Sequence, residues 1–211
     1  MGLRETKKLQ TRQEIADEAM RLFVTHGFED VTVSEVAAAA GVSEKTVFNY
    51  FPTKEDLFFD EVPKREALLV AAMRERESGE SILAAFRRLQ VRECARLCSP
   101  GFANFARVIE ESPALRAKEL EVMAGFALVL TGAIQNELGI DERDARIAAG
   151  LLISVHRQVF QAARKQALAG KHGPAAVRRL RADLERAYDL LEHGLGGLGD
   201  SSRVGRAAAC R

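Results

Sequence analysis

The feature that most constrains this chain is a series of closely spaced helix start and stop signals between residues 27 and 53. Gly27 follows an amphipathic stretch, 11–26, and can adopt the left-handed conformation that ends a helix. Five residues later, Thr32 and Glu35 have the spacing of a capping box, in which two side chains satisfy free N–H groups at a helix start. The spacing predicts that one helix ends at Gly27 and a second begins at Thr32.

Three more signals follow within the next twenty residues. Gly41 can end the second helix, and Ser43 is a typical N-cap for a third. Pro52 ends that third helix, because the residue before proline disfavours the α conformation. Three short helices with a tight turn between the second and third have the size and layout of a helix-turn-helix, which contacts DNA with its last helix.

From Lys54 onward the pattern predicts longer helices separated by Gly, Pro and Ser. Ala, Leu, Arg and Glu are abundant, and only 5 of the 211 residues are Pro, which favours helix. Pro63 is expected to bend or break the first of these long segments. The predicted segments are 54–77, 80–98, 101–110, 115–138, 142–169 and 174–194.

These patterns predict an all-α fold with two domains. Residues 1–54 would form a three-helix helix-turn-helix domain with a basic arm at its start. Residues 55–195 would form a helical domain for effector binding and dimerisation. The Gly-, Ser- and Arg-rich tail, 196–211, is expected to be disordered.

The charge distribution limits how the chain could contact DNA. The formal net charge of the chain is only +1. Four basic residues oppose a single acid, Glu5, within the first twelve residues, whereas residues 13–54 hold seven acids and three bases. We therefore expect DNA contact through a local basic arm and a few placed side chains, and not through a broad positive field.

Five stretches in this order resemble the tetracycline-repressor (TetR) family of transcriptional regulators. The resemblance covers about residues 10–58. It implies an all-helical homodimer of about nine helices per subunit that binds double-stranded operator DNA. The stretches are Phe23 to Gly27, Thr32 to Ala37, Ala40 to Ser43, Thr46 to Phe51 and Lys54 to Leu57.

Periodicity and the resemblance together give a set of candidate DNA contacts. Val47 and Phe51 would face inward on the third helix, which leaves the opposite side for the major groove. The resemblance implies phosphate contacts from three of the set, Thr32, Tyr50 and Lys54. Phe48 stands where many family members carry Tyr, so a phosphate hydrogen bond is absent there. The set is Lys7, Lys8, Arg12, Thr32, Ser43, Glu44, Lys45, Thr46, Asn49, Tyr50 and Lys54.

Several of these candidates also have a purely structural explanation. Thr32 and Ser43 are accounted for as helix caps, whether or not they touch DNA. Tyr50 could be a half-buried core residue, and the basic arm could be a solvated terminus. A carboxylate such as that of Glu44 repels phosphate and can accept only from an exposed base amino group such as cytosine N4.

The C-terminal helices could enclose a pocket for a small, largely apolar effector. No cluster of charges on an apolar face points to a charged ligand. Each candidate could instead be an ordinary core residue, and His156 could be a hydrogen-bonded core or interface residue. The candidate lining is Phe86, Cys94, Phe102, Phe105, Met123, Phe126, Leu130, His156 and Phe160.

Apolar stripes on the last two helices are candidates for a two-fold interface. The alternative is that they are buried in the core of their own subunit. The first stripe is Ala148, Leu152, Val155 and Val159, and the second is Leu180, Leu184, Ala187 and Leu191.

Cys94 and Cys98 share a helix face and could form a thiol switch, although two small buried hydrophobes are the simpler interpretation. No metal or cofactor site is expected. The absence of a signal peptide and of a membrane-spanning apolar run favours the cytoplasm.

Three functions remain open from the sequence. The first is a repressor released from its operator by a ligand. The second is a DNA-binding dimer without an effector. The third is an enzyme on a helical bundle, which is disfavoured because no Glu-x-x-His metal pair, phosphate loop or nucleophile elbow occurs.

Overall fold

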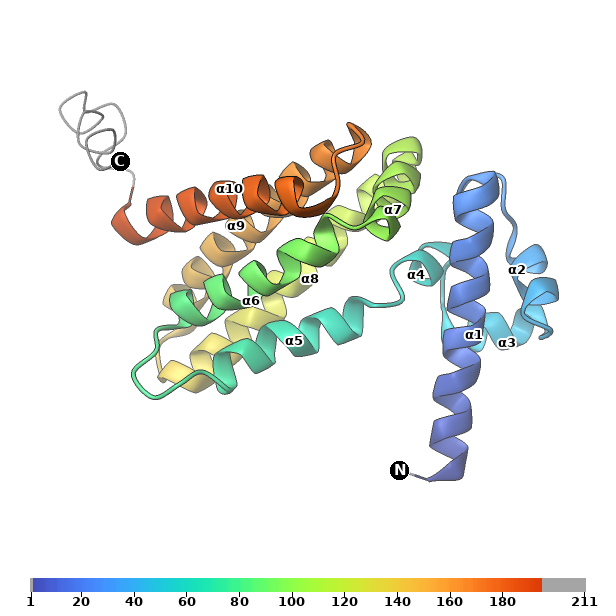
Figure 1. Ribbon diagram of the computed structural model, residues 1–211. Helices are drawn as coiled ribbons and strands as arrows, with labels where there is room; N and C mark the ends of the chain where they lie inside the picture. The colour runs from blue at the N-terminus through green and yellow to red at the C-terminus, as the bar shows by residue number, and fades with distance from the viewer. Residues whose placement is uncertain (1, 195–211) are drawn as a thin grey trace.

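The computed structural model describes residues 2–194, and within them the chain forms ten α-helices (Figure 1). The helical fold predicted from the sequence is confirmed. The predicted tail, 196–211, lies outside the described residues. No helix in the described part is long and apolar enough to cross a membrane. The helices are α1 (Leu3–His26), α2 (Val33–Ala39), α3 (Glu44–Tyr50), α4 (Lys54–Phe58), α5 (Val62–Arg74), α6 (Ile82–Leu97), α7 (Pro100–Glu111), α8 (Pro113–Leu138), α9 (Glu142–Leu168) and α10 (Gly173–His193).

The caps predicted from the sequence set the ends of α2 and α3. The backbone N–H of Glu35 donates to the Thr32 hydroxyl at 3.2 Å, and the Thr32 N–H donates to the Glu35 carboxylate at 2.8 Å. The Ser43 hydroxyl accepts from the Thr46 N–H at 3.1 Å. Gly41 between them has φ +66°, a conformation that side chains with a Cβ rarely adopt. The tight turn of the helix-turn-helix is therefore built from local interactions.

The first helix begins earlier than expected. The sequence predicted a basic arm followed by a helix from residue 11, but α1 begins at Leu3 and includes Lys7, Lys8 and Arg12. No Gly or Pro interrupts residues 3–26, and Lys, Arg, Gln and Leu are all good helix formers. The basic residues are therefore carried on a helix and not on a flexible arm.

The predicted segment 54–77 is divided into α4 and α5. Helix α4 ends at Phe58, and α5 begins at Val62 with Pro63 in its first turn. Proline is favoured in the first turn of a helix and disfavoured further inside, so it favours a new start over a continuous helix. Residues 59–61 therefore form a break between the two helices.

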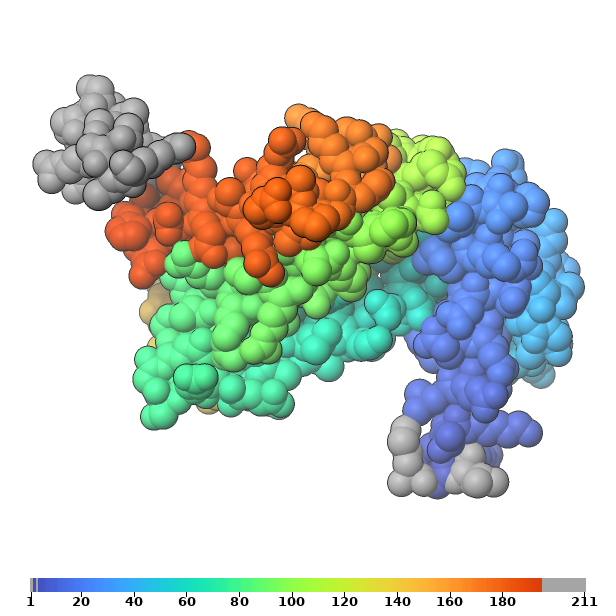
Figure 2. Space-filling model, viewed as in Figure 1, coloured from blue at the N-terminus to red at the C-terminus, as the bar shows by residue number. Residues whose placement is uncertain are grey.

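The helices bury two apolar cores. One core lies among α1–α4 and the adjoining ends of α7 and α8, and includes Phe23, Phe28 and Phe51. The other lies among α5–α10. In the space-filling view the N-terminal helices (blue) form a lobe beside the C-terminal helices (green to red) (Figure 2). Phe58 of α4 stacks on Phe105 of α7 with ring centroids 4.6 Å apart, which joins the two cores. Because Phe58 belongs to the first core, α4 packs with the N-terminal lobe. The domain boundary predicted after residue 54 stays a prediction.

Candidate DNA-contacting surface and effector cavity

Helix α3 presents one exposed face, as the sequence predicted. Val47 is buried against the N-terminal core, while Glu44, Lys45 and Asn49 are exposed. Thr46 is half-buried, and its hydroxyl shares a hydrogen bond with Ser43. A short helix anchored on one side and polar on the other can enter a major groove.

Phe48 lies on the same exposed face and was missed as a candidate contact. Its side chain is 48% exposed, although a phenyl ring is normally buried. An apolar side chain on such a face can contact the methyl group of thymine. The sequence signal was its position, three residues after Lys45 and four after Glu44, because these spacings share a helix face.

Lys54 is directed into the protein. Its ammonium group donates to the backbone carbonyls of Phe28 (2.7 Å) and Val31 (3.0 Å), and lies 4.2 Å from the centre of the Phe28 ring. These contacts hold the loop between α1 and α2. They give Lys54 a structural role in the absence of DNA, and its phosphate contact stays a prediction.

Arg12 is also engaged within the chain. Its guanidinium donates to the Asp60 carbonyl at 3.1 Å, lies 3.8 Å from the Asp60 carboxylate and stacks 4.6 Å from the Phe51 ring centre. Arg12 thereby joins α1 to the break between α4 and α5. Lys7 and Lys8 are exposed on the first turns of α1 and remain available for an external partner.

The other candidate contacts have mixed exposure. Thr32 and Ser43 act as the caps described above, and both remain exposed. Tyr50 is half-buried against the N-terminal core. All three residues therefore have the structural role considered from the sequence, and their DNA contacts stay predictions.

A cavity of about 450 Å³ lies between the two lobes and is bounded by α1 and α4–α9. This volume is in the range of sites for small molecules. Six of the nine residues proposed from the sequence line it: Phe102, Phe105, Met123, Phe126, His156 and Phe160.

The other three proposed residues do not line this cavity. Phe86, Cys94 and Leu130 are fully buried in the C-terminal core. Phe86 and Leu130 lie about one helical turn beyond lining residues of their own helices, Leu89 and Phe126. The apolar pattern continues along each helix past the end of the cavity, where the helices pack directly against each other.

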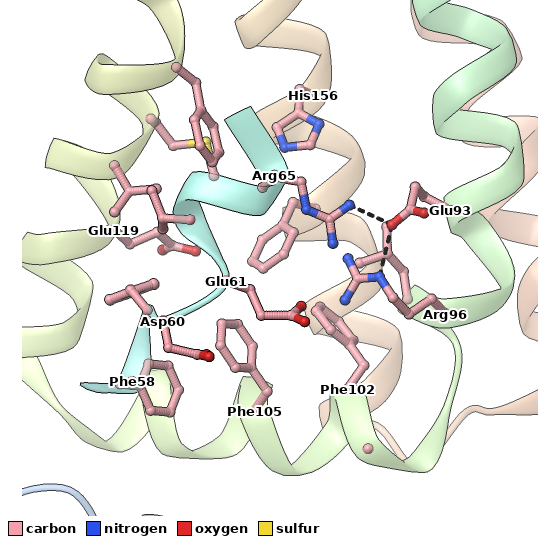
Figure 3. A pocket seen from close by; sticks show the side chains of 18 of the residues that line it. Phe58, Asp60, Glu61, Arg65, Glu93, Arg96, Phe102, Phe105, Glu119 and His156 are labelled. Atoms are coloured by element: carbon pink, nitrogen blue, oxygen red, sulfur yellow. Dashed lines mark hydrogen bonds and ion pairs between the residues drawn. The ribbon is translucent and has the colours of Figure 1, made fainter. Parts of the chain in front are cut away.

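Charged side chains form part of the cavity wall, which the apolar pattern of the helices did not predict. Figure 3 shows those on α5, α6, α8 and the break before α5, among the phenyl rings, and one more lies on α1. They come from polar positions far apart in the sequence, so no local signal marks them. These residues are Asp17, Asp60, Glu61, Arg65, Glu93, Arg96 and Glu119.

Burial and charge change the acidity of three groups in this wall. Burial would raise the pKa of Glu93, but hydrogen bonds from Arg65 and Arg96 outweigh it and hold that pKa below its usual value. Burial raises the pKa of Asp60, although the Arg12 guanidinium opposes the shift. Burial and the two nearby arginines lower the pKa of His156 to about 4, so its imidazole is neutral at pH 7.

The N-terminal lobe contributes directly to the cavity. Gln13, Ala16, Asp17 and Met20 of α1 line it together with the break between α4 and α5. A molecule in the cavity would therefore touch both the helices that position α3 and the C-terminal helices.

The two cysteines are poor candidates for a thiol switch. Both are buried, and burial raises the pKa of each thiol, that of Cys94 to about 11. The thiolate is the reactive form of cysteine, so such a shift suppresses reactivity. The Cys94 thiol donates to the Gln90 carbonyl at 3.3 Å.

The stripes proposed as a two-fold interface are turned inward. Five of the eight residues are buried in the core of their own subunit: Leu152, Val155, Val159, Leu180 and Leu184. The other three, Ala148, Ala187 and Leu191, are half-buried against that core. The alternative considered from the sequence, burial within the subunit, matches this packing. Ile147 and Leu151 lie on the exposed side of α9.

Residues 15–60 match the family model described as bacterial regulatory proteins of the tetR family. The chain is 32% identical over 151 residues to the HTH-type transcriptional regulator TcmR of Streptomyces glaucescens, covering 68% of this chain and 67% of that protein.

Solved structures share the fold. NalD of Pseudomonas aeruginosa, the secondary repressor of the MexAB-OprM multidrug efflux pump, superposes with a TM-score of 0.58 at 19% identity over 85% of this chain and 96% of that one. FadR of Thermus thermophilus, a repressor in complex with lauroyl-CoA, superposes with a TM-score of 0.53 at 24% identity over 87% and 94%. From its sequence relatives and its helix-turn-helix, this chain belongs to the TetR family of transcriptional regulators.

Proposed function

We propose that the chain is a homodimeric repressor that leaves its operator when a small, largely apolar molecule enters the cavity between the lobes. The observation that carries this proposal is the position of the cavity, whose wall includes α1 as well as the C-terminal helices. The FadR structure with lauroyl-CoA supports the idea that this fold can hold a small molecule. We further propose that the chain acts in the cytoplasm and is not an enzyme.

The proposed contacts with DNA are centred on α3. Lys45, Phe48 and Asn49 are exposed on one face and are proposed to contact base edges, with Lys7 and Lys8 on phosphates. Glu44, which is also exposed, and the half-buried Thr46 and Tyr50 remain proposed contacts. A dimer would place two copies of α3 in major grooves about 34–36 Å apart.

The proposed release of DNA depends on which part of the cavity wall the ligand would displace. The break at residues 59–61 lies in the cavity wall and is held to α1 by the contact between Arg12 and Asp60. A ligand that prefers a displaced position of α1 would move the two α3 helices away from the groove spacing. The ligand must bind that displaced state more tightly, because equal affinity for both states shifts nothing.

The test fills the cavity. Met123→Trp places an indole in the lining, and Ala95→Trp, on an exposed position of α6 outside the lining, is the matched control. Operator DNA is first selected from a random library with the wild-type chain, and small, largely apolar molecules, including neutral, anionic and cationic ones, are then screened for release. We expect Ala95→Trp to respond to each active molecule as the wild type does, and Met123→Trp to have lost the response.

Two results would contradict the proposal. If no molecule changes the affinity of the wild type for DNA, the constitutive DNA-binding alternative replaces it. If Met123→Trp responds to active molecules as well as the wild type does, the ligand acts elsewhere.

A further inference from the structure

Two arginines in the cavity wall share a single carboxylate oxygen. Arg65 Nη1 of α5 and Arg96 Nε of α6 both donate to Glu93 Oε2, at 2.5 and 2.8 Å (Figure 3). The three side chains carry two positive charges and one negative charge. Other guanidinium N–H groups therefore remain for a second acceptor, and one positive charge is not neutralised within the group.

Most other acids of the wall are neutralised from outside the lining. Three carboxylates have basic partners that do not line the cavity: Glu119 with Arg164 (3.0 Å), Asp60 with Arg12 (3.8 Å) and Glu61 with Lys64 (3.1 Å). The remaining acid, Asp17, is exposed to solvent on α1, where water screens its charge. The uncompensated charge that lies deepest in the wall is therefore positive, because the Arg65 side chain is only 18% exposed.

His156 adds a polar group beside these arginines. Its ring lies next to Arg65 in the cavity (Figure 3), and burial and the two arginines keep it neutral at pH 7. A neutral imidazole has one N–H donor and one acceptor. A polar ring that borders an apolar cavity is stabilised by a ligand atom that completes its hydrogen bonding.

The remaining wall is aromatic. Six phenylalanines line the cavity: Phe58, Phe59, Phe102, Phe105, Phe126 and Phe160. Phe160 meets Phe102 and Phe105 edge to face, with ring centroids 5.2 and 6.2 Å apart. Aromatic rings prefer offset-stacked or edge-to-face neighbours, so a wall of this kind suits a flat aromatic ligand.

We infer that the effector is an aromatic carboxylate, with its carboxylate on Arg65, Arg96 and His156 and its ring among the phenylalanines. This inference rests on the proposed function, because it names the chemical class that enters the same cavity. Charge-assisted hydrogen bonds from arginine to carboxylate are stronger than neutral ones, and the apolar surroundings strengthen them further.

The test compares three probes that share a naphthalene ring and differ in charge: 2-naphthoate, 2-naphthalenemethanol and 2-naphthylmethylamine. Each is titrated at pH 7 into the purified full chain without DNA, and binding is followed by calorimetry and by naphthalene fluorescence. We expect 2-naphthoate to bind at least about tenfold more tightly than the alcohol, the ratio that one charge-assisted hydrogen bond supplies. The cationic amine should bind most weakly.

Variants test whether the preference for 2-naphthoate depends on the arginine pair. Arg96→Gln, at a position where the side chain is 45% exposed, should remove most of the preference for 2-naphthoate over the alcohol. Glu93→Gln removes the competing negative charge and should tighten binding of 2-naphthoate. Arg88→Gln is the matched control. Arg88 of α6 lies outside the lining and pairs with Glu80, which precedes that helix, so its loss should change nothing.

Several outcomes would overturn the inference. They are binding of the alcohol or the amine as tight as that of 2-naphthoate, no binding by any probe, and an unchanged preference in Arg96→Gln. The proposed function is decided separately, by release of DNA and by the Met123→Trp variant. Release by neutral or cationic molecules alone would leave the repressor proposal standing while this inference fails.

Discussion

Lys54 stabilises the fold at a position where the resemblance predicts a contact with a DNA phosphate. A cation in the first turn of a helix is disfavoured by the helix dipole. In this chain the cost is offset because the ammonium group binds carbonyls of the loop that joins α1 to α2. That loop leads directly into Thr32, the N-cap of the helix-turn-helix.

We therefore expect Lys54→Ala to lower the free energy of unfolding by about 1–3 kcal/mol, because it removes charged hydrogen bonds to partly buried carbonyls. Thermal unfolding of the free protein measures this effect. Lys45→Ala is the control on the exposed face of α3 and should leave thermal stability unchanged while weakening DNA binding. A fully stable Lys54→Ala variant whose DNA affinity loses about one charge of salt dependence would show instead that Lys54 binds phosphate.

At the scale of elements, α3 is a short helix fixed on one side by Val47 and capped by Ser43. Because these local constraints set its orientation, the residues on its outer face are determined once the helix ends are known. The exposed phenyl ring of Phe48 is the unusual feature of that face.

We expect Phe48→Ala to reduce the preference of the selected operator for thymine at one position per half-site, at a cost of roughly 1–3 kcal/mol, since an apolar contact with the thymine methyl is lost. Sequence selection from a random library measures the preference, and thermal unfolding should be unchanged because the ring is exposed. An identical selected motif with identical stringency would contradict this assignment.

The break between α4 and α5 is the second informative element. The sequence predicted one segment over 54–77, bent or broken by Pro63. The break instead places Asp60 and Glu61 in the cavity wall. Any movement caused by a ligand would therefore act on a hinge next to the N-terminal lobe and not along a rigid rod.

At the scale of the whole molecule, the two lobes are joined by polar contacts as well as by the shared phenyl rings. Arg107 of α7 donates to the Val24 carbonyl at 2.8 Å, and Lys118 of α8 lies 3.2 Å from the Asp56 carboxylate. The cavity lies between these joined lobes, so a molecule inside it would contact α1 as well as the C-terminal helices.

The two-fold interface must use residues that the subunit leaves exposed. Leu151 on α9 is 48% exposed, whereas Leu184 on α10 is fully buried. We propose that the exposed side of α9, with Ile147 and Leu151, takes part in the interface, because large apolar side chains exposed together favour association.

We expect Leu151→Glu to give a folded monomer that binds operator DNA weakly, and Leu184→Glu to unfold the C-terminal lobe, because a buried carboxylate lacks a partner. Sedimentation measures association, and circular dichroism measures folding. A folded Leu151→Glu dimer that binds DNA as the wild type does would exclude this face. A folded, monomeric Leu184→Glu variant would restore the stripe originally proposed from the sequence.

The sequence by itself determined the elements of the N-terminal lobe. Caps, turn glycines and prolines act over three or four residues, so Thr32, Gly41, Ser43 and Pro52 are sufficient to predict the turn and the helices around it. The same local chemistry placed most of the later helix boundaries within a few residues. The early start of α1 was missed because its first turns are polar and give no apolar periodicity.

Only the tertiary structure decided which helix faces meet. Helix α9 carries large apolar residues on two sides, Leu152 inward and Ile147 outward, and periodicity cannot say which side a subunit buries. Arg65 and Glu93 are 28 residues apart and become a pair only when α5 packs on α6. The outline of the effector cavity and its charged wall follow from this packing, since long-range contacts leave no local pattern in the chain.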